Sequence, residues 1–94
     1  MDRLLGEAIA VLRGNDRGTW TRPAPRLYPH QWSWDAAVVA IGWAHLDPDR
    51  ALAELRSLLR GQWSTGMVPH IVYDPTVPPG AYEPGPGRWA TAGL

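Results

Sequence analysis

The stretch QWSWD, from Gln31 to Asp35, sets two indole rings beside an amide and a carboxylate. Indole rings stack on the C–H faces of sugars, while amide and carboxylate groups form hydrogen bonds with hydroxyl groups. A second group of polar and aromatic residues follows further along the chain, with Gln62, Trp63, His70 and Tyr73. Residue types of this kind suit a small sugar held in a water-poor pocket.

Each of these residues also has a purely structural interpretation. Trp32, Trp34 and Trp63 could pack in a hydrophobic core, where tryptophan is highly buried on average. Asp35 falls in the expected first turn of a helix, where a carboxylate is stabilised by the helix dipole. A helix-capping role and a ligand-binding role for Asp35 are compatible, so both remain open.

The three histidines do not have the spacing of a metal site. His30, His45 and His70 are too far apart for an H-x-x-x-H pair, and no HExxH motif is present. His45 lies near the end of an expected helix, where it suits the helix dipole or packing. Glycine-rich nucleotide-binding motifs and a GxSxG serine motif are also missing. We therefore expect neither a metal nor a cofactor.

Two helices are expected before residue 47. Apolar residues recur at helical spacing over 2–13, which gives that segment one apolar face. The segment 15–32 contains three prolines and reads as an irregular connection. The segment 33–46, with Ser33 as the expected N-cap, is apolar nearly all round. Such a helix needs packing partners on several sides.

A third helix is expected over 48–60, with Asp47 as N-cap, Pro48 as first residue and Gly61 as stop. Its leucines form a stripe on one side, with the charged residues mostly elsewhere. Because the turn at Asp47 is tight, this helix should pack antiparallel to the one before it. The chain after Gly61 should then return to the end where segment 33–46 began.

Composition limits the partners of the chain. Nine arginines balance nine acidic residues, which gives no electrostatic reason to expect nucleic acid or an anionic membrane. No apolar run approaches the roughly 20 residues of a membrane span. Cysteine is absent, so a reducing, cytoplasmic compartment is expected. Three helices cannot cover a helix that is apolar all round, so residues 1–94 are expected to be part of a larger domain.

Two motifs together carry a specific family resemblance. YPHQWSWDAAVVAIGWA and GQWSTGMVPHI resemble the start of the catalytic domain of mannosylglycerate and glucosylglycerate hydrolases, which belong with glycoside hydrolase family 63. The resemblance implies an all-α fold: the N-terminal portion of an (α/α)6 barrel, made of three helices and long irregular loops. It also implies a partial domain over 1–94, incomplete at its C-terminus.

In that family, the loops that enter the inner helices line the sugar pocket. The resemblance implies that Trp34 and Asp35 contact the sugar, and that His70 lies near the glycerate or leaving group. Tyr82 and Trp89 would help to cover the pocket. The substrate-binding residues implied are Tyr28, Gln31, Trp32, Trp34, Asp35, Gln62, Trp63 and His70.

No catalytic residue is assigned. Hydrolysis with inversion needs an acid and a base about 6.5–9.5 Å apart, and the family takes both from later in its chain. Asp74 and Glu83 match no catalytic motif position. The resemblance implies part of a glycosidase for a small α-glucoside or α-mannoside, such as glucosylglycerate or mannosylglycerate. The alternative is a non-catalytic carbohydrate-binding or helical interaction fragment.

Overall fold

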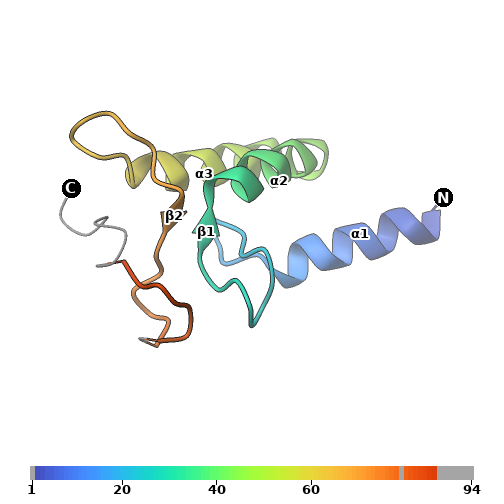
Figure 1. Cartoon of the computed structure of the whole chain (residues 1–94). Coiled ribbons are helices and arrows are strands. Elements are labelled where there is room, and N and C mark those ends of the chain that lie inside the picture. Colours follow the sequence, from blue (N-terminus) through green and yellow to red (C-terminus); the bar gives the residue numbers. More distant parts are fainter. Residues whose placement is uncertain (1, 79, 87–94) are drawn as a thin grey trace.

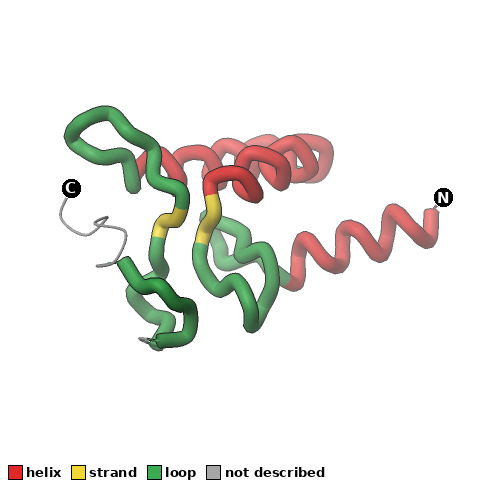
Figure 2. Tube along the Cα trace, in the orientation of Figure 1, coloured by secondary structure: helices red, strands yellow, loops and turns green. Residues whose placement is uncertain are grey.

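The computed structural model describes residues 2–78 and 80–86 and is mostly helical (Figures 1 and 2). Its elements are α1 (Asp2–Gly14), β1 (Gln31–Trp32), α2 (Ser33–Leu46), α3 (Pro48–Arg60) and β2 (Ile71–Val72). The three helices predicted from the sequence are confirmed, with α1 one residue longer than expected. The two short strands were not predicted.

Helices α2 and α3 lie side by side as a hairpin (Figure 1). The side chain of Asp47 accepts a hydrogen bond from the Arg50 N–H at 3.2 Å, and Pro48 opens α3, as expected. On α2, the buried residues are Ala36, Ala40 and Trp43, three or four positions apart. This spacing places them on one face of the helix. Small alanines therefore let the two helices approach, and the Trp43 ring fills the far end.

The buried face of α3 differs from the expected leucine stripe. Leu52, Leu55 and Leu59 are exposed, whereas Arg50 and Glu54 are buried. Buried charges are tolerated when they are paired and hydrogen-bonded. The prediction that the charged residues of α3 lie mostly outside the packed face was wrong for these two, because polar groups of the segment before β1 meet them there.

Glu54 is the centre of this polar network and has no exposed surface. Its Oε2 accepts hydrogen bonds from the Thr21 backbone N–H at 3.1 Å and from Gln31 Nε2 at 2.7 Å. Its Oε1 accepts a hydrogen bond from the Thr21 hydroxyl. Burial raises the pKa of Glu54, and the hydrogen bonds from Thr21, the Arg50 charge and the hydrogen bond from Gln31 oppose that rise. The carboxylate thus ties the irregular segment and β1 to α3.

Arg50 extends the network to the end of α1. Its guanidinium donates two hydrogen bonds to Asp16 Oδ1, at 2.8 and 3.0 Å, and lies 4.7 Å from the centre of the Trp43 ring. Arg50 Nη2 and Trp43 Nε1 both donate to the Thr21 hydroxyl oxygen, at 3.2 and 2.9 Å. The Thr21 hydroxyl therefore uses its one proton and both lone pairs inside the network.

The return of the chain after α3 is confirmed by strand pairing. β1 and β2 are antiparallel, with Gln31 opposite Val72 and Trp32 opposite Ile71. The next backbone bond runs from the Ser33 N–H to the His70 carbonyl at 2.9 Å. The expected N-cap at Ser33 was wrong: Trp32 is the N-cap, without a side-chain cap. The orphan N–H of Ser33 is satisfied by the neighbouring strand instead.

Gly61 ends α3 at a point where β2 passes very close. A Cβ atom at this position would lie 2.7 Å from Val72 Cγ2, well inside van der Waals contact. Its φ of −85° is ordinary for any residue, so space and not backbone strain requires glycine here. The absence of a side chain lets the end of α3 and β2 pack together.

Large apolar surfaces remain open on α1 and α2. Trp34 is 76% exposed and Ile41 66% exposed on α2, and none of the described residues of α1 is buried. Between the two helices lies an apolar groove of about 210 Å³, lined by Leu5, Ile9 and Leu12 on one side and by Gly42 on the other. This exposure is consistent with the expectation that α2 needs packing partners in addition to α3. Among the described residues, no helix has the length and apolarity needed to cross a bilayer.

Candidate functional site

Consecutive residues of β1 face opposite sides of the strand. Gln31 points toward α3, where its amide nitrogen bonds to Glu54. The Trp32 side chain points the other way, into a group of aromatic rings. Both residues are buried. The resemblance assigned Gln31 and Trp32 to one sugar pocket, but only Trp32 lies among aromatic rings in the structure.

The aromatic cluster consists of Tyr28, His30, Trp32, Tyr73 and Tyr82. Trp32 meets Tyr28 and Tyr82 edge-on, with ring centres 5.4 and 4.9 Å apart. His30 lies 4.6 Å from Tyr73 and 6.1 Å from Trp32, measured between ring centres. Edge-to-face pairs at these distances are favourable beyond their buried area. The cluster joins the segment before β1 to the segment after β2.

His30 was considered in the sequence only as a metal ligand, yet it is central to this cluster. It is buried, and its Nδ1 accepts a hydrogen bond from the Asp74 N–H at 2.9 Å. An accepting Nδ1 requires the neutral ring with its proton on Nε2. Burial lowers the pKa of His30, and the Asp74 carboxylate opposes that effect. The alternate spacing of Tyr28, His30 and Trp32 was the available sequence signal, since it suits one face of an extended segment.

Trp34 and Asp35 occupy the first turn of α2. Trp34 is largely exposed, and Asp35 is half-buried. Acidic side chains are common in the first turn of a helix, near the partial positive charge of its N-terminal end. His70 is brought beside this turn by its backbone bond to Ser33, and its side chain is exposed. The Trp34 ring, the Asp35 carboxylate and the His70 imidazole are therefore attached to backbone at or beside the start of α2.

Gln62 and Trp63 lie in the loop before β2. Gln62 is exposed and donates a hydrogen bond to the Gly66 carbonyl at 2.7 Å, which closes the loop on itself. Trp63 is half-buried in a pocket of about 190 Å³ that it shares with Pro69 and Tyr73. Its buried Nε1 has no hydrogen-bond partner within the described ranges. The structure thus places Trp63 beside Tyr73 of the cluster, whereas Gln62 bonds within its own loop.

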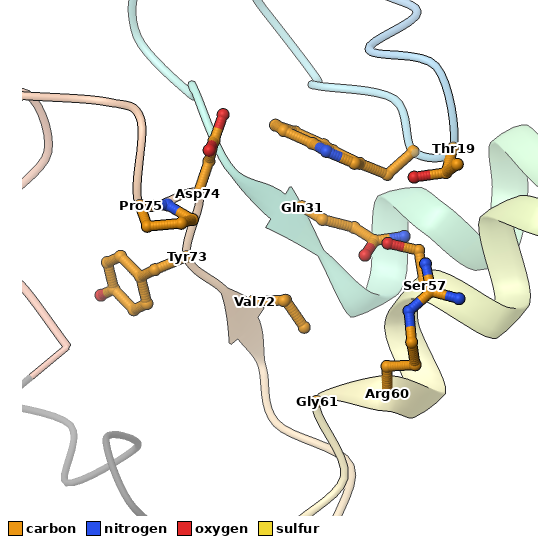
Figure 3. A pocket seen from close by; sticks show the side chains of 10 residues that line it. Thr19, Gln31, Ser57, Arg60, Gly61, Val72, Tyr73, Asp74 and Pro75 are labelled. Atoms are coloured by element: carbon orange, nitrogen blue, oxygen red, sulfur yellow. The ribbon is translucent and has the colours of Figure 1, made fainter.

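A larger pocket of about 300 Å³ lies on the Gln31 side of β1 (Figure 3). Gln31, Ser57 and Val72 point toward it from β1, α3 and β2. The Gln31 Oε1 atom is buried, and it lacks a hydrogen-bond partner in the described part of the chain. Neither Trp32 nor Trp34 lines this pocket. The pocket therefore borders the aromatic cluster at Tyr73 but does not include Trp32.

The acidic residues after β2 are engaged in local turns. Asp74 Oδ1 accepts hydrogen bonds from the N–H and hydroxyl of Thr76, at 2.9 and 2.8 Å. Glu83 Oε2 accepts one from the Gly85 N–H at 3.2 Å. Over residues 2–78 and 80–86, no group of three His, Cys, Asp or Glu side chains could hold a metal ion. Trp89, expected to help cover the pocket, lies outside the described residues.

Sequence comparison identifies the family. The model of the mannosylglycerate hydrolase MGH1-like glycoside hydrolase domain matches residues 28–93. The chain is 58% identical over 92 residues to the glucosylglycerate hydrolase of Mycolicibacterium hassiacum, covering 98% of this chain and 20% of that enzyme. It is 47% identical over 89 residues to the mannosylglycerate hydrolase of Rubrobacter radiotolerans, covering 95% and 20%. The chain thus spans about a fifth of the length of these relatives.

Comparison with solved structures supports the same family. The mannosylglycerate hydrolase of Thermus thermophilus, from glycoside hydrolase family 63 and crystallised with Tris, matches with a TM-score of 0.84 and 45% identity. The match covers 93% of this chain and 21% of that one. The glucose complex matches with a TM-score of 0.71 and 49% identity over 74% of this chain and 17% of that one. The predicted fold class, part of a helical (α/α)6 barrel, is confirmed. With both its sequence and its fold matched, the chain belongs to the mannosylglycerate hydrolase MGH1-like glycoside hydrolase family.

Proposed function

We propose that this chain supplies the sugar-binding subsite of a glycoside hydrolase that acts on a small α-glucoside or α-mannoside, such as glucosylglycerate or mannosylglycerate. The observation that carries the proposal is the exposed Trp34 ring and the half-buried Asp35 in the first turn of α2, which directly follows β1. Glucose and D-glycerate are each named as ligands in complexes of the similar enzyme from Thermus thermophilus. A cytoplasmic location, with no nucleic acid or membrane partner, completes the proposal.

The geometry supports a distinct role for each residue. Trp34 offers an open ring face to stack on a sugar, and Asp35 offers a carboxylate to its hydroxyls. Trp32 and Tyr28, whose rings pack edge-on, would form a wall of the same subsite. His70, whose side chain is exposed, would lie on the side of the glycerate or other leaving group.

The remaining three candidates act less directly. Gln31 fixes β1 to α3 through Glu54, which positions the neighbouring Trp32. Gln62 and Trp63 shape the loop that borders the pocket on the Tyr73 side. We expect substitutions at these positions to change substrate binding through the position of β1 and the loop.

The bond-breaking groups are proposed to come from elsewhere in the enzyme. Asp74 and Glu83 both use their carboxylates in local turns. We expect the 94-residue chain by itself to release no sugar from glucosylglycerate or mannosylglycerate. Sugar release that is abolished by Asp74→Asn or Glu83→Gln would refute this assignment.

The test places this chain in a complete enzyme. The matching segment of the Mycolicibacterium hassiacum enzyme would be replaced by this sequence, and kcat/KM measured for glucosylglycerate. Asp35 lies in the first turn of α2 and is not its N-cap, so Asp35→Asn leaves the cap unchanged and removes only the charge. A lost charged hydrogen bond corresponds to roughly a 10- to 150-fold lower kcat/KM. We expect a loss in that range with little change in melting temperature.

Asp49→Asn is the matched control, because Asp49 also lies in the first turn of a helix and is exposed. Its kcat/KM should stay within twofold of the unmodified chimera. If Asp35→Asn behaves like this control, Asp35 is only a helix-terminal charge and the subsite assignment fails. An inactive chimera, combined with sugar binding by the isolated chain, would favour the alternative of a non-catalytic carbohydrate-binding module.

A further inference from the structure

The segment after β2, described over 74–78 and 80–86 and called segment 74–86 below, contacts the aromatic cluster and has little regular structure of its own. Its backbone bonds, Val77 N–H to the Asp74 carbonyl at 3.2 Å and Ala81 N–H to the Pro78 carbonyl at 3.1 Å, are local turns. It nevertheless places the Tyr82 ring 4.9 Å from Trp32, edge-on. Contacts from outside the segment hold it in this position, among them the hydrogen bond from the Tyr73 hydroxyl to the Pro84 carbonyl at 2.7 Å.

His30 contacts this segment in two independent ways. Its Nδ1 accepts the Asp74 N–H at 2.9 Å, where the segment leaves β2. Its ring lies 6.3 Å from Tyr82, edge-on, and 4.6 Å from Tyr73. Because His30 stands two residues before Trp32, it couples the segment directly to the strand that carries the wall of the proposed subsite.

We propose that His30 is a positioning residue: it latches segment 74–86, and with it the Tyr82 ring, onto Trp32. The inference goes beyond the proposed function because His30 is not one of the proposed sugar-binding residues. It rests on the proposed function only in taking the sugar subsite as the reason for holding Tyr82 against Trp32. The cavity of about 400 Å³ between His30 and the segment is lined by Tyr73, Tyr82 and Glu83 among others.

The latch requires a neutral imidazole. A protonated ring would carry a hydrogen on Nδ1, facing the Asp74 N–H as donor against donor. The titratable groups that line the cavity with His30 are Asp74, Glu83, Tyr73 and Tyr82. Burial lowers the pKa of His30 although the Asp74 carboxylate opposes the shift. The latch should therefore be complete above the usual histidine pKa of about 6.5 and open as the pH falls through the lowered value.

The test uses the chain as it stands, with no sugar present. Amide exchange of Asp74 and magnetisation transfer between the Tyr82 and Trp32 rings would be followed by NMR. His30→Phe keeps a ring but removes the acceptor, so exchange of the Asp74 amide should become about tenfold faster. In His30→Asn, Oδ1 replaces Nδ1 as acceptor, so this amide should keep most of its protection. His45→Asn, at an exposed position on α2, is the control and should change neither signal.

Lowering the pH tests the latch in the unmodified chain, without a substitution. After correction for intrinsic exchange, protection of the Asp74 amide should decrease as the pH is lowered in the unmodified chain, and the contact between the Tyr82 and Trp32 rings should decrease with it. In His30→Asn, both should stay constant. Unchanged protection in His30→Phe, or equal losses in His30→Asn and His30→Phe, would overturn the latch. Protection independent of pH in the unmodified chain would do the same, even if His30→Phe does not fold. These readouts are independent of the Asp35 kinetics, so either proposal can fail alone.

Discussion

Replacing Glu54 by glutamine probes the polar network that holds the irregular segment and β1 against α3. Glutamine has the same shape, but one of its two terminal groups is an NH2 donor. At the Oε2 position that donor would face the Thr21 N–H and Gln31 Nε2, and at the Oε1 position it would face the Thr21 hydroxyl and Arg50. Either orientation turns two attractive contacts into donor–donor contacts.

Rotation of the Thr21 hydroxyl cannot relieve the conflict, because its oxygen already accepts from Trp43 Nε1 and Arg50 Nη2. A hydrogen bond to a charged group contributes about 1.5–3 kcal/mol, so two lost bonds amount to about 3–6 kcal/mol. Removing a buried charge offsets part of this loss. We expect Glu54→Gln to lower the free energy of unfolding by about 2–4 kcal/mol, a large fraction of the stability of a small domain.

The measurement is urea unfolding at pH 7.5, followed by circular dichroism and tryptophan fluorescence. Glu7→Gln is the control, since Glu7 pairs with Arg3 across one turn of α1 and both side chains are exposed, at 62% and 92%. Exposed pairs of this kind contribute well under 1 kcal/mol. If Glu54→Gln costs no more than Glu7→Gln, the network does not organise the fold and the reasoning is refuted.

Two further substitutions test the packing. Gly61→Ala would place a Cβ 2.7 Å from Val72 Cγ2 and should cost about 1–3 kcal/mol, and the double variant with Val72→Ala should recover most of that loss in thermal unfolding. We expect the isolated chain to self-associate through its exposed apolar surface, and Ile41→Glu, at a position that is 66% exposed, should reduce this in sedimentation velocity without lowering the melting temperature. Ala40→Glu, one residue away but buried against α3, should unfold the chain, and equal effects of the two would contradict the assigned face of α2.

Local sequence features determined the helices and the turn between α2 and α3. Helical periodicity needs only neighbouring residues, so the three helices could be placed nearly to the residue. Asp47 and Pro48 act through side-chain and backbone geometry within one turn, and their roles were also predictable. The tight turn then implied the return of the chain toward β1. The joint motif around Trp32 and Trp63 was specific enough to indicate the family.

Tertiary structure decided where the polar groups go. Pairing of β1 with β2 satisfies the Ser33 N–H from the His70 carbonyl, so a local capping rule failed there. Glu54 is buried because donors from Thr21 and Gln31, distant in sequence, converge on it. Sequence alone gave no pattern for that convergence.

The same reason explains what was missed or misplaced around the candidate site. His30 joins the aromatic cluster only because β2 brings the Asp74 N–H to its Nδ1. Gln31 and Trp32 are adjacent in sequence, but strand geometry sends them to opposite sides, one to Glu54 and one to Tyr82. Residue types and local periodicity are properties of the chain itself, whereas the partner of each side chain depends on segments that meet only after folding.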